Sequence, residues 1–525
     1  MVRDPIALTA AQHGLSVLVV SSYLLLEIWS PNVSQQGITP RKDDYSQWYL
    51  DVIAAGELTD KSPVRGCMVI KPHGYGIWEN IQRDLDDRFK ATGHVNAYFP
   101  MFIPESFLSK EAEHVEGFAK ECAVVTHHRL RSAENGGVEP DPGAKLEEPL
   151  VVRPTSETII WHMYGKWINS YRDLPLLINQ WANVVRWEMR TRPFLRTAEF
   201  LWQEGHTAHA TSEEAMEEAE RMLGVYSDFA HEMLALPVIP GVKSASERFA
   251  GAVETYTIEG MMQNGWALQA GTSHFLGQNF AKAFDVTFQS SEGKLEHVWA
   301  TSWGVSTRLV GAVIMAHSDD TGLVLPPRVA PIQVVIVPIW RKEEDRVAVE
   351  EFAKNVEAKL RGSVRVHLDN RPKMKPGAKY FEWERKGVPL RFEVGPRDVA
   401  NGSVFCAKRT GGPKFGIEVT DDLLNVVQAE LEAIQQGLLD AAVARREENT
   451  HRIDSYEQMK KMLDENPGFF LVPWHDDAEK EREIKEDCKA TIRCFPLDAQ
   501  DDVEGLQCFY TNRPATHMAI FARAY

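Results

Sequence analysis

Cysteine is scarce in this chain, and the few cysteines present show no pairing pattern. Six cysteines occur among 525 residues, and no two of them are spaced as a CxxC pair. Small secreted proteins that depend on disulfides are rich in cysteine, whereas proteins of reducing compartments are not. The sequence therefore predicts a protein without a disulfide framework, in a reducing compartment.

An excess of positive charge is also missing. The chain carries 58 Lys and Arg against 75 Asp and Glu, which gives a formal net charge of −17. Nucleic-acid-binding proteins are usually basic, so this total argues against a general affinity for polyanions. A local basic groove is not excluded, because recognition depends on the local potential and not on the total charge.

No apolar run is long enough to cross a bilayer comfortably. The apolar stretch at residues 15–29, LSVLVVSSYLLLEIW, is shorter than the ~20 residues of a membrane-spanning helix. It follows one early positive charge, Arg3, and has no clear cleavage site, so it is a poor match to a secretory signal. We predict no membrane partner. Residues 1–37 form an N-terminal extension, for which a poor targeting sequence, an added helix and a gene-start artefact are the alternatives.

The composition is that of a large globular protein. Hydrophobic residues make up 44% and charged residues 25% of the chain, and the length is enough for about three domains. Prolines at positions 326, 327 and 331 mark a boundary. Beyond it, expected strands and helices alternate as far as residue 445, which predicts a small α/β domain with a mainly parallel sheet. Residues 446–525 form a further unit.

Arg186 and Glu188 lie at the end of an apolar run, residues 176–187, that is typical of a strand. Residues two apart on a strand project from the same face, so a cation and an acid would share one face of a buried sheet. Buried charges need partners, and an anionic and a cationic ligand would supply them. An Arg–Glu pair that merely stabilises the strand is the alternative.

Two further segments have a clear local pattern. Apolar residues four apart predict an amphipathic helix over residues 76–92, and residues 97–103, which contain Pro100, are typical of an edge strand. A long helix followed by such an edge strand is a natural dimer-forming unit. The Gly- and Pro-rich residues 131–147 are expected to form a loop.

Several motifs resemble the signatures of a known enzyme class. Residues 74–104, the hairpin around Arg186, and STR at residues 306–308 on glycine-rich flanks look like the three motifs of class II aminoacyl-tRNA synthetases. Within that class the chain resembles the prolyl-tRNA synthetase family. The motifs that carry this closer resemblance are RPTSET at 153–158, FLRTAEFLWQEGH at 194–206 and GTSH at 271–274.

The resemblance covers the chain from about residue 38 to its end and implies a multidomain α+β fold. A catalytic domain with an antiparallel sheet would span residues 38–328, an α/β anticodon-binding domain residues 329–445, and a small α+β domain residues 446–525. It is the archaeal/eukaryote-like type of the family that the chain resembles. The roughly 100 residues between Glu204 and Ser306 leave no room for the editing domain that the bacterial-type enzymes insert there.

The implied reaction joins L-proline to ATP and then to tRNA(Pro). The carboxylate of proline attacks the α-phosphorus of ATP, and the prolyl-adenylate then reacts with the terminal ribose of the tRNA. Positioning and charge stabilisation would carry most of the catalysis. The family implies Mg²⁺ on the phosphates and a homodimer.

The resemblance also assigns individual residues. Arg186 and Arg308 would be the catalytic residues, Arg186 on the α-phosphate and the carboxylate of proline and Arg308 on the γ-phosphate. The positions that match ATP-contacting residues are Arg186, Glu188, Arg196, Thr197, Phe200, Gln269, Thr272, Ser306 and Arg308. The positions that match proline-contacting residues are Thr155, Glu157, Arg186, Glu188 and His274.

Each of these residues has a simpler interpretation when taken alone. Thr155 and Glu157 could form a helix cap. His274 could be a satisfied polar residue in a loop, and Phe200 could belong to the core. Their occurrence together, in the order of the family, favours the functional interpretation.

The C-terminal unit departs from the pattern of the family. Relatives often hold zinc there with four cysteines, and the aligned positions in this chain are His475, Lys480, Cys508 and Thr511. Lysine and threonine are poor zinc ligands, so we predict no structural zinc and no metal ligands. A makeshift site is the alternative, and it would use Cys488, Cys494, Cys508 and His517. The terminal Tyr525 matches the last residue of the family.

Two other activities are compatible with the same motifs. One is a silent paralogue that binds tRNA without catalysis, and the other is a ligase that transfers an activated amino acid to a different acceptor. The retained active-site residues and the anticodon-type domain argue against both. We expect a cytoplasmic protein. Plastid and mitochondrion are the alternatives, because the amino-acid sequences of the motifs resemble those of organellar enzymes of plants and algae.

Overall fold

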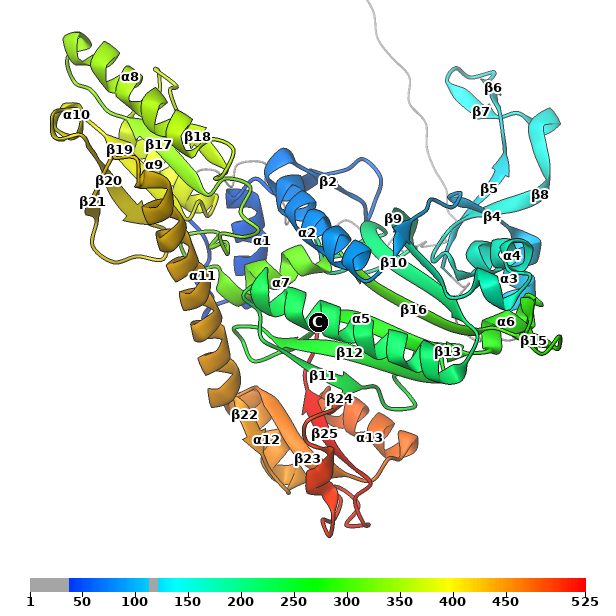
Figure 1. Ribbon diagram of the computed structural model, residues 1–525. Helices are drawn as coiled ribbons and strands as arrows, with labels where there is room; N and C mark the ends of the chain where they lie inside the picture. Colours follow the sequence, from blue (N-terminus) through cyan, green and yellow to red (C-terminus); the bar gives the residue numbers. More distant parts are fainter. Residues whose placement is uncertain (1–36, 113–120) are drawn as a thin grey trace, which may run out of the picture. The chain divides into compact units, whose positions relative to one another are not determined.

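An 11-stranded sheet forms the centre of the protein (Figure 1). In spatial order its strands are β22 (Thr450–Arg452), β23 (Phe469–Trp474), β25 (His517–Ala522), β24 (Thr491–Pro496), β11 (Val238–Val242), β12 (Glu254–Met261), β13 (Ala267–Gly277), β16 (Trp299–Ser306), β10 (Glu199–His209), β9 (Leu176–Val185) and β3 (Val95–Asn96). From β11 to β9 all neighbours pair antiparallel, which agrees with the antiparallel core expected from the sequence. The computed structural model describes residues 37–112 and 121–525, so the N-terminal extension lies almost wholly outside the described residues.

The C-terminal residues do not form a separate sheet but extend the central one. The junction is the pairing of β11 with β24, in which Gly241 lies opposite Pro496 and Val242 opposite Phe495. A Cβ atom on Gly241 would lie 2.6 Å from the Cβ of Cys494, closer than two carbon atoms can approach. A glycine is therefore required where the two parts of the sheet meet. The sequence did not indicate this continuity.

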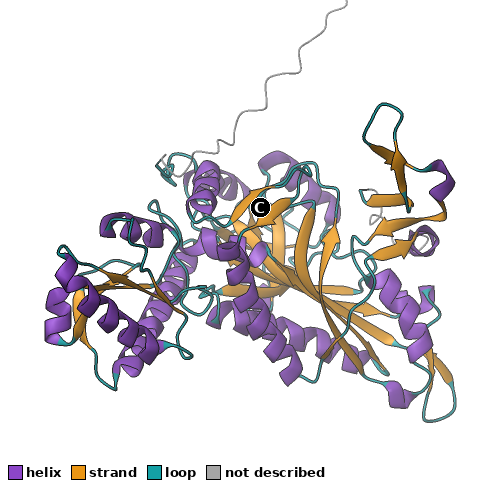
Figure 2. Ribbon diagram, turned by 90° about the horizontal axis from the view of Figure 1, so that it is seen from above, coloured by secondary structure: helices purple, strands orange, loops and turns teal. Residues whose placement is uncertain are grey.

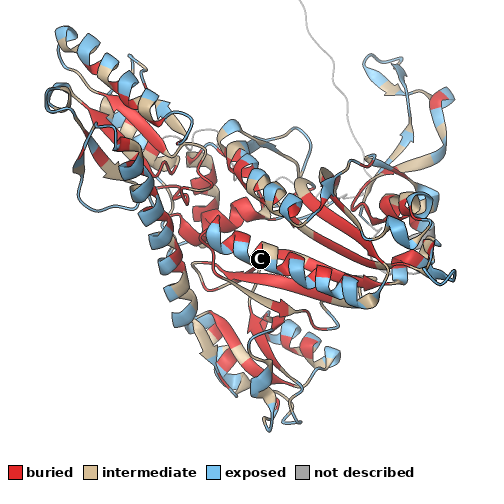
Figure 3. Cartoon of the chain, in the orientation of Figure 1, coloured by how far each residue is buried: buried red, intermediate tan, exposed pale blue. Residues whose placement is uncertain are grey.

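Four helices close the hydrophobic core on the central sheet. They are α1 (Tyr45–Ala55), α2 (Pro72–Ala91), α5 (Ser212–Glu232), which lies across β12, β13 and β16, and α7 (Arg308–His317). Ile77, Ile81, Leu85 and Phe89 of α2 are all buried, which confirms the helix expected over residues 76–92. Figure 3 shows the same division, with buried strands and helices that are buried on one side only.

Smaller elements surround the sheet. A three-stranded sheet combines β4 (Phe102–Pro104), β8 (Lys145–Val152) and β5 (Ala123–His127), beside helices α3 (Glu105–Ala112) and α4 (Glu157–Trp167). The remaining elements of this part are β1 (Thr59–Lys61), β2 (Met68–Ile70), β6 (Leu130–Ser132), β7 (Val138–Pro140), α6 (Asn279–Ala283), β14 (Thr287–Gln289) and β15 (Leu295–His297). No helix in the described part of the chain combines the length and the apolar character needed to cross a membrane.

Two local expectations were wrong. Residues 97–101 are not a strand: the backbone N–H of Phe99 donates to the Gln180 side chain, and Pro100 has no N–H to offer a sheet. Residues 131–147 are not a plain loop, because β6 and β7 pair as a hairpin. Its turn contains Gly136 and Gly137, both with positive φ, a conformation that glycine adopts without strain.

A second, five-stranded sheet follows the proline-rich boundary. Its order is β18 (Val366–Leu368), β17 (Val334–Pro338), β19 (Leu390–Val394), β20 (Ser403–Lys408) and β21 (Phe415–Glu418). The helices of this region are α8 (Glu343–Leu360), α9 (Pro376–Arg385), α10 (Pro396–Asn401) and α11 (Leu423–Glu448), and Figure 2 shows helices packed against this sheet. The expected α/β alternation is confirmed, but the sheet is mixed: β17 pairs parallel with β18 and β19, whereas β19, β20 and β21 pair antiparallel. Helix α11 leads on to β22 and to α12 (Tyr456–Glu465) and α13 (Ala478–Cys488).

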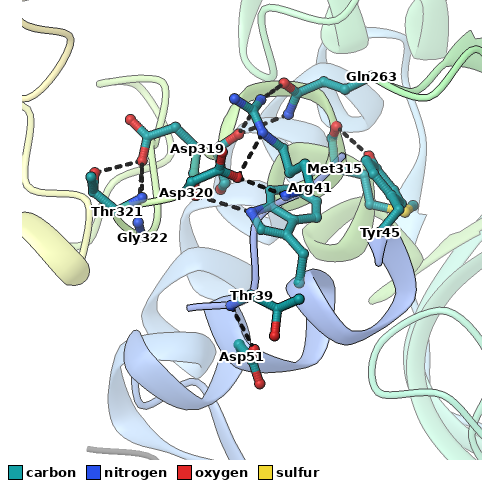
Figure 4. Close-up of polar contacts among 12 residues, drawn as sticks. Thr39, Arg41, Tyr45, Asp51, Gln263, Met315, Asp319, Asp320, Thr321 and Gly322 are labelled. Atoms are coloured by element: carbon teal, nitrogen blue, oxygen red, sulfur yellow. Dashed lines mark hydrogen bonds and ion pairs between the residues drawn. The ribbon is translucent and has the colours of Figure 1, made fainter. Parts of the chain in front are cut away.

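The segment that follows α7 connects this second sheet to the rest of the protein. Arg409 donates two hydrogen bonds to the Asp319 carboxylate, at 2.8 and 2.6 Å. The backbone oxygen of Asp319 accepts from the indole of Trp48 at 3.0 Å. Figure 4 shows the adjoining contacts, in which Arg41 pairs with Asp320 and hydrogen-bonds the side chain of Gln263. The end of α7 is thus held from both sides.

The Arg409–Asp319 pair should make stability depend on pH. Burial alone would raise the pKa of Asp319, but the hydrogen bonds and charge of Arg409, together with hydrogen bonds from Thr321, lower it to about 2. A folded-state pKa below the unfolded value of about 3.9 contributes stability that is present above about pH 4 and is lost as the pH falls toward 2.

We therefore expect Asp319→Asn to destabilise the protein at pH 7 by about 1 kcal/mol, since the carboxylate is part-exposed. Urea unfolding at a series of pH values measures the effect, and the difference from wild type should shrink as the pH falls below about 4. Asp421→Asn is the control, because Asp421 pairs with Lys359 on the open surface. Equal stability of Asp319→Asn and wild type at pH 7 would contradict the prediction.

Candidate active site

A cavity of about 290 Å³ opens on the central sheet, lined by residues of β10, β12, β13 and β16. The alternation along β10 explains which side chains reach it. Gln203 faces the opposite side, where its amide oxygen accepts a hydrogen bond from Tyr226 of α5 at 2.5 Å. The even-numbered residues of β10 therefore face the side of the cavity. Four of them line it: Phe200, Trp202, Glu204 and His206.

The structure brings the sequence-predicted residues to this one place. Those that line the main cavity are Thr155, Glu157, Arg186, Phe200, Gln269, Thr272, His274, Ser306 and Arg308. The others line an adjoining cavity of about 80 Å³, and they are Glu188, Arg196 and Thr197. Arg186, Phe200, Ser306 and Arg308 belong to both cavities, so the two form a continuous trough.

Arg186 and Glu188 reach the trough from a turn that follows β9, and not from one face of a strand as their spacing suggested. Strand β9 ends at Val185, and only one further backbone bond, from Arg186 N–H to the oxygen of Ala198 at 2.8 Å, continues its pairing. The N–H of Glu188 then donates to the oxygen of Arg186 at 2.7 Å, which turns the chain. The strand geometry expected through position 187 was therefore wrong. Glu188 forms an ion pair with Arg196, Oε1 to Nε at 3.7 Å.

Three guanidinium groups gather around the trough. Arg186 donates from Nε to the oxygen of Pro154 at 3.0 Å and lies over the rings of Phe200 and Trp202. Arg308 donates from Nε to the oxygen of Leu195 at 3.3 Å. Burial, followed by repulsion from Arg196 and Arg186, lowers the pKa of Arg308 to about 10. Burial also lowers the pKa of Arg186. An anion bound between these groups would relieve their repulsion.

The other end of the cavity is rich in carboxylates. The hydroxyl of Thr155 donates to Glu157, and the helix-cap alternative is not supported because the N-cap of α4 is Ser156, without a side-chain cap bond. Glu204 accepts from Gln180 at 2.7 Å and lies 3.0 Å from Nε2 of His206. Buried carboxylates side by side favour a cation between them.

The environment of His206 favours its protonated form. Burial alone would lower the pKa of His206, but the hydrogen bond to Glu204 and the charges of Glu157 and Glu204 raise it. Burial would raise the pKa of Glu204, but His206, Ser156 and Gln180 lower it. Nδ1 of His206 and Oγ of Ser302 are buried and have no hydrogen-bond partner in the described part of the chain. A polar ligand in the cavity could satisfy both atoms.

Glu157, Glu204 and His206 are also the one group of potential metal ligands found among residues 37–112 and 121–525. Their ligating atoms lie within 4.8 Å of one another. The Glu157 carboxylate already accepts a hydrogen bond from Thr155, and that of Glu204 accepts from Ser156 and Gln180, so these oxygens have partners without a metal ion. An organic ammonium group, which donates hydrogen bonds to carboxylates, fits this end better.

His274 of β13 lies at the carboxylate-rich end, across Ser302 of β16 from His206 of β10. Its Nδ1 is 3.0 Å from the hydroxyl of Thr255, and its ring stacks on Phe249 with centroids 4.5 Å apart. Burial, followed by the charge of His206, lowers the pKa of His274 to about 3, so its imidazole is neutral. His274 also lines the cavity, and an ordinary polar residue of a loop would not have to do so.

Several residues of the cavity were not foreseen from the sequence. Trp202, Glu204 and His206 belonged to a recognised motif without an assigned role, and their spacing of two from Phe200 was the available signal. Lys243, Phe249 and Ser302 also line the cavity. They had no local signal, because they come from separate strands and loops that only the folded sheet brings together.

In the C-terminal unit the makeshift zinc site does not form among the described residues. Cys488 donates to the oxygen of Ile484 at 3.3 Å, and His517 stacks on Phe495 with centroids 4.3 Å apart. His475 contacts the oxygen of Pro514, and Lys480 pairs with Glu483. All six cysteines are unpaired thiols.

Comparison with known families matches each part of the chain. Residues 140–317 match the tRNA synthetase class II core domain of the G, H, P, S and T enzymes. Residues 333–430 match an anticodon-binding domain. Residues 456–525 match the C-terminal domain of prolyl-tRNA synthetase.

Whole-chain relatives agree with these matches. The proline–tRNA ligase of Porphyromonas gingivalis is 59% identical over 490 residues, covering 93% of this chain and 99% of the relative. That of Cytophaga hutchinsonii is 59% identical over 487 residues, with 92% and 99% covered. These relatives are bacterial, and the comparisons do not show the expected resemblance to organellar forms.

A solved structure is similar as well. The crystal structure of prolyl-tRNA synthetase from Cryptosporidium parvum, complexed with halofuginone and AMPPNP, has a TM-score of 0.85 and 40% identity, covering 93% of this chain and 99% of that one. With a class II core that uses ATP, an anticodon-binding domain and relatives that are ligases over nearly their whole length, the chain belongs to the prolyl-tRNA synthetase family and is a proline–tRNA ligase that acts on proline and tRNA(Pro).

Proposed function

We propose that the trough holds ATP and proline end to end, with the reacting carboxylate and α-phosphorus beside Arg186. The observation that carries this assignment is the shared position of Arg186 and Arg308 on one cavity, where burial lowers the pKa of both guanidinium groups and repulsion from Arg196 and Arg186 lowers that of Arg308 further. Arginine offers paired donors to anionic oxygens. Arg308 would hold the γ-phosphate, and Arg186 the α-phosphate and the carboxylate of proline.

The carboxylate-rich end would receive the secondary ammonium of proline. Thr155 and Glu157 lie together there, and Glu204 with His206 completes that side. His274, neutral and stacked on Phe249, would border the apolar part of the ring. Glu188 would act from the side of the phosphates, where it already neutralises Arg196.

The remaining predicted residues would bind the nucleotide. Phe200 offers a ring that is half-buried and not part of a core, and Arg186 lies over it at 5.5 Å. Arg196 and Thr197 lie beside it on the smaller cavity. Gln269, Thr272 and Ser306 supply polar side chains along the main cavity.

Mg²⁺ fits the phosphate end and not the proline end. Glu188 offers a carboxylate, and Gln269 and Thr272 offer neutral oxygens, a donor set suited to an ion that also takes phosphate oxygens and waters. When bound, the ion would offset the charge of the phosphates. We further propose that the protein carries no structural zinc, because the cysteines of the C-terminal unit do not gather around a common point.

We propose catalytic residues 38–328, anticodon-binding residues 329–445 and C-terminal residues 446–525, in a cytoplasmic homodimer. The unpaired thiols fit a reducing compartment. The dimer would form at the edge strand β3 and the segment that follows it, where Val95 of the strand is exposed by 57% and Tyr98 of the segment by 70%. An exposed apolar edge strand is suited to pairing with a second copy.

Arg186→Ala should abolish amino-acid activation, because the anionic oxygens lose their fixed partner in a site of low dielectric. We expect proline-dependent ATP–pyrophosphate exchange to fall by roughly 10³-fold. Arg190→Ala, on the exposed turn of the same hairpin, is the control and should keep its activity. Near-normal exchange by a folded Arg186→Ala protein would refute the role, and no exchange by the wild type with any amino acid would favour the silent paralogue.

Arg308→Ala should act mainly on ATP. We expect its Michaelis constant for ATP to rise by roughly 10- to 100-fold, with a smaller change in that for proline, since the lost contact is with the far phosphate. Exchange kinetics with each substrate varied in turn measure both constants. An unchanged dependence on ATP would count against the assignment.

The dimer prediction is tested by the mass in solution. Light scattering during gel filtration should give twice the mass of one chain, and Tyr98→Asp should shift the protein toward the monomer by burying a charge in the interface. Leu295→Asp, on an exposed hairpin that we place outside the interface, is the matched control. A monomeric wild type at micromolar concentration would overturn the proposal.

A further inference from the structure

One wall of the main cavity is a short segment between β11 and β12. Lys243, Glu247 and Phe249, which line the cavity, all belong to residues 243–249. Phe249 stacks on His274, and its backbone N–H donates to the hydroxyl of Thr255 at 3.1 Å. The same hydroxyl contacts Nδ1 of His274 at 3.0 Å. The position of this segment therefore decides where the ring of His274 lies.

The C-terminal unit holds this segment at its middle. Glu481 of α13 accepts hydrogen bonds from Ser244, at 3.1 Å, and from Ser246. Its side chain is buried, with 3% of the residue exposed. Lys485, one turn further along the same helix, pairs with Glu247 at 3.0 Å. Contacts from one helix thus fix residues 244, 246 and 247.

A second anchor lies at the start of the segment. Nζ of Lys243 donates to the backbone oxygen of Arg493 in β24 at 2.7 Å and to Glu259 at 2.8 Å. Arg493 itself donates to the other oxygen of Glu259 at 3.1 and 3.0 Å. Lys243, Glu259 and Arg493 are all buried. The amine of Lys243 is therefore turned toward the C-terminal unit, and its chain forms the cavity wall.

These buried polar contacts join two parts of the protein at a higher cost in free energy than apolar contacts would. Burying the Glu481 carboxylate and the Lys243–Glu259–Arg493 group carries a desolvation penalty that packed apolar side chains would avoid. Directional hydrogen bonds, however, fix a backbone more narrowly than apolar contacts do. These contacts are therefore better suited to hold the backbone of residues 243–249 in place than to raise the stability of the protein.

We propose that the C-terminal unit is a built-in support of the amino-acid site, and that Glu481 is a positioning residue for binding of the substrate amino acid. Through Ser244 and Ser246 it sets the backbone of residues 243–249, and through Phe249 it sets His274. The inference rests on the proposed assignment of this end of the cavity to proline. It adds a role for a unit that supplies no side chain to the cavity lining.

The test is a separation of kinetic constants in ATP–pyrophosphate exchange by the full-length enzyme. Glu481→Ala should raise the Michaelis constant for proline by about 10-fold, because small displacements of a positioning group are costly, while that for ATP stays within about twofold. Glu481→Gln keeps an acceptor for one serine and a donor for the other, and should restore most of the affinity for proline. Glu486→Gln, on the exposed side of α13, is the matched control and should behave as wild type.

A purely structural role for Glu481 predicts a different result. Glu481→Ala would then lower the unfolding midpoint and the fraction of active enzyme, with the Michaelis constant for proline unchanged, and this outcome would overturn the proposal. Ser246→Ala provides a second route if Glu481→Ala does not fold. Ser246→Ala should raise the Michaelis constant for proline by less than Glu481→Ala does. An unchanged Michaelis constant would also overturn the proposal. If the wild type, measured in parallel, shows no proline-dependent exchange, then the assignment of this cavity to proline is itself wrong.

Discussion

The whole site depends on the antiparallel pairing of β16 with β10 on one side and with β13 on the other. This pairing places alternate side chains of distant segments on one face of the sheet, with Trp202 opposite Ser306 and Glu204 opposite Gly304. The opposite face is closed by α5, so the cavity can form on one side only. Arg308 begins the helix that leaves β16, and Arg186 follows directly on β9. Two cations more than a hundred positions apart in the chain are held together although they repel one another.

The two ends of the cavity have opposite electrical character. Arginines surround one end, and Glu157, Glu204 and His206 surround the other. In the proposed assignment, this difference would orient a substrate that has a cationic nitrogen and a carboxylate, with its carboxylate toward the arginines. The attack that begins the reaction would then need no side chain as a nucleophile or base. This agrees with a chemistry in which positioning and charge stabilisation do most of the work.

The C-terminal unit has become part of the same framework. Its sheet continues the catalytic sheet through Gly241, and its buried charges reach the segment that walls the cavity. An apolar core that includes Trp474, Phe509 and Phe521 fills the interior of this unit. The packing of this core and the joined sheet together explain how the unit can stay ordered. Its attachment to the active site then follows from the pairing of β11 with β24.

The sequence alone determined the chemistry of this protein and much of its local structure. Residues such as Arg186, Arg308, Thr155 and Glu157 stand in motifs whose order and composition already implied the reaction, and the four-residue spacing in α2 defined that helix, because both signals are local. Tertiary structure decided the rest. Hydrogen bonds such as that from Lys243 to Arg493 join residues 250 positions apart, and no local pattern records such a contact. Contacts between distant segments set where β9 ends and made the second sheet mixed. They also raised the pKa of His206 and joined the C-terminal unit to the cavity wall.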